Sequence, residues 1–499
     1  MSIEEYDVVV VGAGNAALVA ALTAHEAGAR VVVLEAASRA ERGGNSRFSG
    51  AIFRAVHDGL DSLRPILADT DPEVLERVSV AAYTRGDYID DWFTTSQGRP
   101  PRMLVERVVD QSFDTLVWMR EHGVRWELTA DKLFDPAHLD GVYALTPGGA
   151  IRSRGEGVGL VAALFDAVEK AGIEVRYDSP ASGLITRGSA VDGVLVRRDS
   201  GVEEVRGVVV LACGGFEANP EMRRRYLGEG WDLVKVRGTR FNMGTMLAKT
   251  LDAGAQPAGH WGGCHASPQD AAHPPVGDLR LTDKLARYSY PYALLVNSAG
   301  ERFVDEGENQ VFLTYAKTGA AILRQPRAVA YQIFDQRTAH LLEPRYRTAT
   351  PVEAGTLTEL AARLDISAET LETTVAEFNK SVAADADVRF DPTALDAVSA
   401  RPDGQPPKSN WAVPLDRPPF LAYPVTCGIT FTYGGLKVDA EAQVLDVTGR
   451  PMPGLYATGE IAGDFFHYNY AAGAGLMRGA VFGRIAGANA AARATGVRQ

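Results

Sequence analysis

The sequence predicts an α/β protein in which a Rossmann-type domain is divided between the two ends of the chain by an inserted α+β domain. Apolar runs typical of buried parallel strands occur, for example, at Val8–Val11 and Val208–Leu211, and each leads into a glycine-rich turn. Over residues 226–345 such runs stop, and aromatic residues, Gly and Pro mix with charges. We therefore expect residues 1–225 and 346–499 to form the divided domain around the insertion.

The first element is a strand–turn–helix–strand unit. A strand-like run leads into Gly12-Ala-Gly14-Asn-Ala-Ala17, and a second apolar run at 31–34 ends in Glu35, 23 residues after Gly12. Gly12 permits a tight turn, Gly14 lets the backbone approach a pyrophosphate, and Ala17 lets helix and strand pack closely. Glu35 can accept hydrogen bonds from a ribose. This pattern favours a dinucleotide site over the alternative, an ordinary β-α-β unit with small residues for packing.

The later elements follow from periodicity and capping signals. The pattern predicts helices within 70–130 and at 160–170, strands at 173–175, 191–196 and 208–211, a helical segment at 356–376, a Pro- and Asp-rich surface loop at 390–420 and a final helix at 475–492. The helical segment at 356–376 opens with the capping box Thr356-x-x-Glu359. Gly214 and Gly215 follow the strand at 208–211, where the ligands of an open α/β sheet bind.

Composition narrows the class of function. The 499 residues carry a formal charge of −12, which argues against binding of a nucleic-acid backbone. The three cysteines lie far apart without a C-x-x-C pattern, so we expect no metal site and no disulfide framework. From the same cysteine usage we expect a reducing cytoplasm. We expect no signal peptide, because Val8–Val11 lies too close to the start without a basic region, and no membrane span, because no apolar run reaches 18 residues.

Several motifs occur in the order of one known superfamily. They are the amino-terminal fingerprint, Gly43-Gly-Asn-Ser46, Leu211-Ala-Cys-Gly-Gly-Phe216, Gly300-Glu-Arg-Phe-Val-Asp-Glu306 and Pro453-Gly-Leu-Tyr-Ala-Thr-Gly-Glu460. With them, the chain resembles the fumarate reductase/succinate dehydrogenase flavoprotein superfamily over nearly its whole length. The segments Asn15–Leu18, Arg237–Gly244 and Gly428–Tyr433 resemble its tricarballylate dehydrogenase-like branch.

The resemblance implies FAD in an extended pose across the divided domain, with the insertion as a capping (substrate) domain that closes over the isoalloxazine. Covalent members attach FAD through a His in the loop after the first unit. Residues 44–49 contain no His, so we expect noncovalent FAD. The residues expected at the cofactor are Gly12, Gly14, Asn15, Ala16, Glu35, Gly43, Gly44, Asn45, Ser46, Ala181, Gly214, Gly459, Glu460, Gly475 and Leu476.

The implied activity is that of an FAD-dependent dehydrogenase acting on CH–CH groups. A carbon–carbon bond next to a carboxylate or carbonyl is desaturated, or reduced, by hydride transfer at flavin N5 with tyrosine- or arginine-assisted proton transfer. Desaturation of tricarballylate to cis-aconitate is the model for the branch. The sequence departs from fumarate reductases, because Thr430-Phe431-Thr432 replaces their His-His-Thr and because Tyr470 and Tyr315 stand in place of two arginines.

These tyrosines support an alternative, since they resemble those of the 3-ketosteroid Δ1-dehydrogenases. On that analogy Tyr315 accepts the proton and Tyr470 polarises a ketone. A tyrosine with its ordinary pKa of about 10 is a poor base at neutral pH, so Tyr315 would need a neighbouring cation or an acidified substrate. The structural alternative is that both rings only pack.

A carboxylate substrate would need arginine forks. Arg237, Arg240 and Arg302 are the candidates, and the alternative for each is a salt bridge that fixes the inserted domain. His265 and His467 are further candidates for proton transfer or for substrate or flavin contact, although a lone His is more often structural. Thr430, Phe431 and Tyr433 are expected near the substrate.

Reduced flavin would pass its electrons to an external acceptor. A second nucleotide turn is not evident, because Gly155-Glu-Gly-Val-Gly159 follows no strand. The options are oxygen, a quinone or an electron-transfer protein. A third interpretation, a non-catalytic electron-transfer flavoprotein, predicts no capping domain, whereas residues 226–345 look like one.

Overall fold

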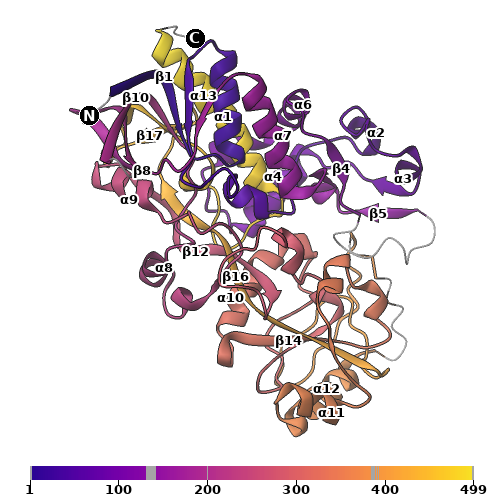
Figure 1. Ribbon diagram of the computed structural model, residues 1–499. Helices are drawn as coiled ribbons and strands as arrows, with labels where there is room; N and C mark the ends of the chain where they lie inside the picture. Colours follow the sequence, from indigo (N-terminus) through magenta and orange to yellow (C-terminus); the bar gives the residue numbers. More distant parts are fainter. Residues whose placement is uncertain are drawn as a thin grey trace.

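The computed structural model describes residues 3–130, 142–198, 201–383, 388, 390–391 and 393–496. The chain forms two units, each built on its own sheet (Figure 1). The amino-terminal and carboxyl-terminal segments lie together in the upper unit of the figure, and the middle of the chain forms the lower unit. This arrangement confirms the predicted α/β class and the division of the Rossmann-type domain.

The upper unit contains the parallel core of the fold. Its strand order is β17-β18-β10-β1-β2-β7, in which β1 runs parallel to both β10 and β2, and β8 and β9 extend β10 as antiparallel strands. The valine runs predicted as strands form β1, β2 and β10, because side chains buried on both faces suit a covered parallel sheet. The strands are β1 (Ile3–Val11), β2 (Val31–Leu34), β7 (Glu174–Arg176), β8 (Ala181–Arg187), β9 (Ala190–Arg198), β10 (Gly201–Leu211), β17 (Gln443–Leu445) and β18 (Pro451–Ala457).

Helices from opposite ends of the chain pack closely against this sheet. The first helix, α1 (Asn15–Glu26), lies along the last, α13 (Ala474–Thr495), as Figure 1 shows. Small residues make the approach possible, since a Cβ at Gly483 would stand 2.7 Å from the Ala16 carbonyl oxygen. A Cβ at Gly487 would stand 2.3 Å from the Ala20 carbonyl oxygen. The small-residue composition predicted for the last helix therefore serves helix–helix contact.

The lower unit is built on a mixed sheet of order β11-β16-β14-β13, with β12 and β15 also paired to β16. Because β15 and β16 belong to this sheet, the strand pairing of the insertion extends to residue 436. The sheet therefore continues past the boundary predicted at residue 346, because no local pattern encodes long-range strand pairing. The strands are β11 (Lys235–Val236), β12 (Pro257–Asp270), β13 (Leu294–Asn297), β14 (Val329–Phe334), β15 (Val352–Ala354) and β16 (Phe420–Leu436).

The helical segment predicted at 356–376 is two helices. Thr356 accepts a hydrogen bond from the Glu359 backbone, as the capping box predicts, but α11 ends at Asp365 in a left-handed conformation, and Ser367 caps α12. The helices not yet given are α2 (Leu60–Leu63), α3 (Pro72–Glu76), α4 (Arg85–Thr95), α5 (Arg102–Asp110), α6 (Ser112–Glu121), α7 (Glu156–Lys170), α8 (Pro220–Leu227), α9 (Thr245–Asp252), α10 (Tyr315–Leu323), α11 (Leu357–Leu364) and α12 (Ala368–Ser381).

Two small sheets complete the upper unit: β3 (Val78–Val80) pairs with β5 (Tyr143–Leu145), and β4 (Trp126–Leu128) pairs with β6 (Ile151–Ser153). Within the described ranges, no helix combines the length and apolarity needed to cross a bilayer.

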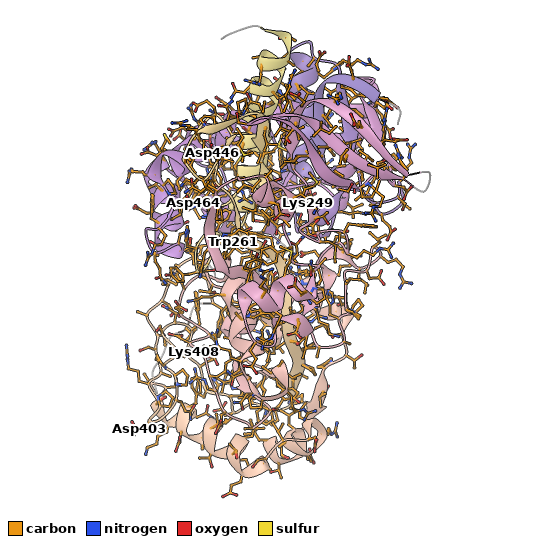
Figure 2. All side chains as sticks on the ribbon, turned by 90° about the vertical axis from the view of Figure 1, so that its left-hand side faces the viewer. Lys249, Trp261, Asp403, Lys408, Asp446 and Asp464 are labelled. Atoms are coloured by element: carbon orange, nitrogen blue, oxygen red, sulfur yellow. The ribbon has the colours of Figure 1, made fainter. Side chains whose placement is uncertain are left out.

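The ribbon of β12 and β16 connects the two units. Figure 2, turned by 90° from Figure 1, shows Trp261 of β12 between Lys249 above it and Lys408 below it. The ribbon pairs antiparallel with two register shifts, and the second lies directly after His265, whose partner on β16 is Phe431. The ribbon therefore carries side chains of the insertion to the wall of the upper sheet.

Candidate active site

One continuous cavity of about 450 Å³ lies where the two units meet. It opens from the carboxyl ends of β1 and β10, the usual ligand site of an open α/β sheet, and runs to the β12–β16 ribbon. Most of the predicted site residues line it: Gly12, Gly14, Asn15, Ala16, Glu35, Gly44, Asn45, Ser46, Ala181, Gly214, Gly459, Glu460, Gly475, Leu476, Arg237, His265, Tyr315, Thr430, Phe431 and Tyr470.

The end of the cavity near β1 fits a dinucleotide. Gly12 adopts a φ of 102°, and a Cβ there would stand 2.5 Å from the Ala212 carbonyl oxygen, so the turn requires glycine. Gly14 is the N-cap of α1 and has no side chain to cap the helix, which leaves a helix N-terminus facing the cavity, as a pyrophosphate needs. Ser46 accepts a hydrogen bond from the Asn15 backbone and holds the next loop against this turn.

Glu35 lies at the same end, almost completely buried. Its Oε1 accepts a hydrogen bond from the Ala37 backbone at 2.8 Å, and burial raises the pKa of Glu35 to about 7. A buried carboxyl with spare acceptor capacity suits the hydroxyls of a ribose.

A pair of buried carboxyls, Glu217 and Glu460, supports the middle of the cavity. Glu460 accepts from the backbone and hydroxyl of Thr432 at 2.7 and 3.0 Å. Glu217, which the sequence analysis did not find, accepts from Asn45 and Asn242. Burial raises the pKa of both carboxyls, and the neighbouring Glu460 raises the pKa of Glu217 further. The network ties the Gly43–Ser46 loop to the insertion.

Aromatic rings line the other end of the cavity. The His265 ring stacks on Phe431 with centroids 5.3 Å apart and meets the edges of Tyr315 and Tyr470 at 4.9 and 5.2 Å. Tyr288 continues the row, 4.7 Å from Tyr315. Burial and the nearby Arg237 lower the pKa of His265 well below its usual range, so the imidazole is neutral at neutral pH.

The Tyr470 hydroxyl is held by the backbone. It accepts a hydrogen bond of 2.9 Å from the amide of Gly473, the N-cap of α13. In this bond the Gly473 amide is the donor and the Tyr470 oxygen is the acceptor, so the bond does not use the phenolic proton. Tyr470 can therefore donate that proton to a carbonyl oxygen in the cavity. Tyr470 is thus equipped to polarise a carbonyl.

Beyond Tyr288 the cavity wall carries charge of both signs. Asp283 forms ion pairs with Arg237 and with Arg345, the latter at 2.9 Å, and Glu343 accepts from Arg345 at 2.6 Å. All four side chains are buried. Burial alone would lower the pKa of each guanidinium, but the facing acids and Tyr288 raise it, so both arginines stay charged. Two cations and two anions leave this wall close to neutral.

A family model described as an FAD binding domain matches residues 7–476. The chain belongs to this FAD-binding family. The cofactor is therefore FAD, and the dinucleotide end described above fits it.

The relatives of this chain agree with an enzyme of this kind. The probable fumarate reductase Ifc3 of Shewanella frigidimarina (strain NCIMB 400) is 28% identical over 98% of this chain and 76% of its own length. The 4-oxocyclohexanecarboxylate 2-dehydrogenase of Sinomonas cyclohexanicum is 29% identical over 98% of this chain and 94% of its own length. A solved structure, the open conformation of a flavocytochrome c3 fumarate reductase, has a TM-score of 0.70 and 26% identity, and covers 98% of this chain and 79% of the other.

The chain is accordingly an FAD-dependent oxidoreductase that acts on carbon–carbon bonds, and it is similar to members of the fumarate reductase superfamily. These relatives do not support the non-catalytic interpretation, because they are dehydrogenases and reductases. The tricarballylate dehydrogenase-like branch has no counterpart among them.

Four predicted side chains lie outside the cavity. Arg240 is 60% exposed and pairs with Glu41, so its side chain faces solvent although its neighbours Thr239 and Phe241 line the cavity. Arg302 is fully buried, where it forms a salt bridge with Glu306 and donates to the carbonyls of Pro406 and Pro407. This arrangement matches the alternative of a salt bridge within the inserted domain. His467 stacks over His260 at 6.1 Å, away from the cavity.

Tyr433 lies one layer behind the wall, packed against Phe431. Gly43 also does not line the cavity. It takes a φ of 108°, and a Cβ there would overlap the Val161 side chain, so it shapes the loop from behind.

The sequence analysis missed several side chains in the cavity wall, among them Asp283, Tyr288 and Arg345. These residues come from 3-10 turns and loops of the insertion, where the sequence has no motif and no periodic pattern. Only the aromatic run Tyr288–Tyr292 offered a signal, and it was not distinctive. Arg478, also missed, is buried in α13, and burial lowers its pKa to about 10.

We predict that FAD affinity falls as the pH drops below 7. The ribose hydroxyls favour ionised Glu35, so its pKa is lower with FAD bound than the value of about 7 without it. At pH values between these two pKa values, protonation of Glu35 in the free protein opposes FAD binding. Above pH 7 Glu35 is ionised with and without FAD, and the affinity is constant. Titration of apoprotein with FAD by fluorescence quenching from about pH 5.5 to 8.5 measures this slope. Glu35→Gln should remove it, and an equal slope in both proteins would contradict the assignment.

We also predict that denaturation releases all of the flavin. The loop at 44–49 has no His to form a covalent link. Acid precipitation followed by absorbance of pellet and supernatant measures this, and yellow colour in a washed pellet would refute noncovalent binding.

Proposed function

We propose that the protein is a ketone α,β-desaturase, or the corresponding reductase, which forms or reduces a carbon–carbon double bond next to a carbonyl. The observation that carries the proposal is Tyr470, which lines the cavity and whose hydroxyl accepts a hydrogen bond from the Gly473 amide. This arrangement leaves the phenolic proton for a carbonyl oxygen, which is the group that acidifies the neighbouring C–H bond.

The relatives support a ketone substrate in one respect. The Sinomonas enzyme, which this chain matches over nearly its whole length, is named for dehydrogenation of a cyclic ketone acid. The resemblance of Tyr315 and Tyr470 to the tyrosines of 3-ketosteroid Δ1-dehydrogenases agrees with it.

The charge of the wall argues against a polycarboxylate such as tricarballylate. Of the three arginines considered as carboxylate forks, Arg237 alone lines the cavity, and Asp283 already occupies it. Arg345, the other guanidinium of the wall, faces Asp283 and Glu343. A substrate carboxylate would meet Asp283 as well as the arginines, and three carboxylates would need several free cations.

Tyr315 is the proposed proton carrier. Burial, Tyr470 and Tyr288 raise its pKa, and Arg237 opposes this shift in part. A neutral phenol is ready to donate a proton in the reductive direction. In the oxidative direction it can accept one only if the carbonyl, held by Tyr470, first makes the substrate more acidic.

When bound, the flavin supplies the hydride chemistry of the family. The chain's own contribution is to bind the carbonyl, to hold the proton at the Tyr315 oxygen, and to exclude water. The rings of His265, Phe431 and Tyr288 make the wall largely apolar, which strengthens the hydrogen bond from Tyr470.

Replacing Tyr470 by Phe should slow flavin reduction by a cyclic ketone about 10²-fold or more, because one preorganised donor to a developing oxyanion is lost. Anaerobic single-turnover bleaching of the flavin measures the step, with Tyr292→Phe, a buried tyrosine outside the cavity, as the matched control. An unchanged rate in Tyr470→Phe would remove this residue from the mechanism.

Replacing Asp283 by Asn should raise the affinity for cyclohexanecarboxylate about tenfold or more, since it frees two charged donors while keeping an acceptor in place. The shift of the flavin absorbance on titration measures binding. Arg240→Ala, on the surface, should leave this affinity unchanged. If Asp283→Asn binds the carboxylate no better than the parent protein, the wall does not exclude carboxylates through Asp283.

A further inference from the structure

We propose that Arg54 is a positioning residue that strengthens the Tyr470 hydroxyl as a hydrogen-bond donor, acting through the Ala472–Gly473 peptide unit. The inference rests on the proposed function, because it assigns to Tyr470 the task of polarising a carbonyl. Arg54 lies on the far side of the loop from the cavity and does not line it.

One peptide unit joins the two side chains. The Arg54 Nε donates to the carbonyl oxygen of Ala472 at 2.8 Å. The other end of the same peptide unit is the Gly473 amide, which donates to the Tyr470 hydroxyl oxygen at 2.9 Å. A cation on the carbonyl draws electron density towards it and makes the amide a stronger donor, and a stronger donor on the phenol oxygen makes the phenolic O–H more acidic.

Burial makes the charge of Arg54 effective. The side chain is 1% exposed, so water screens it little. Burial alone would lower its pKa, but Tyr83 and Asp91 outweigh burial and raise it, so the guanidinium is charged at neutral pH. Its Nη1 donates to both the Tyr83 hydroxyl and the Asp91 carboxylate.

The loop that carries Tyr470 is held from both units. On the side of the insertion, the Ala472 amide donates to the Phe312 carbonyl at 2.9 Å, and Asn469 donates to the Leu313 carbonyl at 2.7 Å. On the side of the FAD-binding unit, Arg54 is the contact. A Cβ at Gly473 would stand 2.8 Å from the Arg54 backbone nitrogen, so the approach of the two segments requires glycine.

Substitution of Asp91 distinguishes an electrostatic role of Arg54 from a purely structural one. Its side chain is 28% exposed, and it neutralises Arg54 from the side away from the loop. Asp91→Asn keeps a hydrogen-bonding oxygen for Arg54 but removes the opposing charge, so the field of Arg54 at the Ala472 carbonyl increases. Arg54→Met removes the field altogether. The two variants should therefore act in opposite directions.

The test uses FAD-loaded protein and 4-nitrophenol, a coloured phenol whose phenolate resembles the enolate of a cyclic ketone. The absorbance of the bound probe, taken across its titration, gives its pKa in the site. In the parent protein we expect this pKa to be lower than in water. In Arg54→Met the phenolate fraction near the free pKa should fall about tenfold, and Arg54→Lys, which keeps charge and donor, should restore part of it. In Asp91→Asn the phenolate fraction should rise.

Each outcome decides a separate claim. If Arg54→Met ionises the probe as the parent protein does, or if Asp91→Asn lowers the phenolate fraction as well, Arg54 has no electrostatic role and the inference is overturned. If Arg54→Met fails to fold with FAD, Asp91→Asn decides alone. If the parent protein itself does not lower the pKa of the probe, the proposed function of Tyr470 fails, and this inference with it.

Discussion

The pairing of β12 with β16 is the contact on which the site depends. β16 begins in the sheet of the insertion and ends against the FAD-binding unit, and β12 runs antiparallel beside it. A single ribbon therefore brings His265 and Phe431 face to face at the cavity. β16 also positions Thr432 to donate twice to Glu460, which fixes the cofactor side of the wall. A slip of register by one residue would exchange the two faces of the ribbon and remove both sets of contacts.

The site combines an apolar row with two polar ends. Aromatic rings from Tyr470 to Tyr288 separate the Gly473 amide from the group of Asp283, Arg237 and Arg345. Together with Glu343 behind Arg345, these charges are paired, and breaking a buried pair of this kind costs about 3–5 kcal/mol. The chain therefore keeps two arginines in the cavity wall without leaving them available to a second carboxylate, and the hydroxyl of Tyr470 becomes the donor best suited to the reacting carbonyl.

The sequence predicted those parts that depend on local chemistry. The turn at Gly12, the acid at Glu35 and the final helix at 475–492 follow from backbone and periodicity rules, and the structure has all three. Tyr315 and Tyr470 also line the cavity as predicted. Asp283 and Arg345 were beyond prediction, because they become neighbours only when distant turns of the insertion meet. Arg240 lies three residues from Arg237, but its side chain faces solvent and does not line the cavity, which no local pattern indicates.

The most direct measurement is anaerobic reduction of the bound flavin by a panel of cyclic ketones, dicarboxylates and tricarboxylates, followed at the flavin absorbance maximum. The account predicts rapid bleaching by at least one saturated cyclic ketone and none by succinate or tricarballylate. Rapid bleaching by tricarballylate, with no response to ketones, would contradict it.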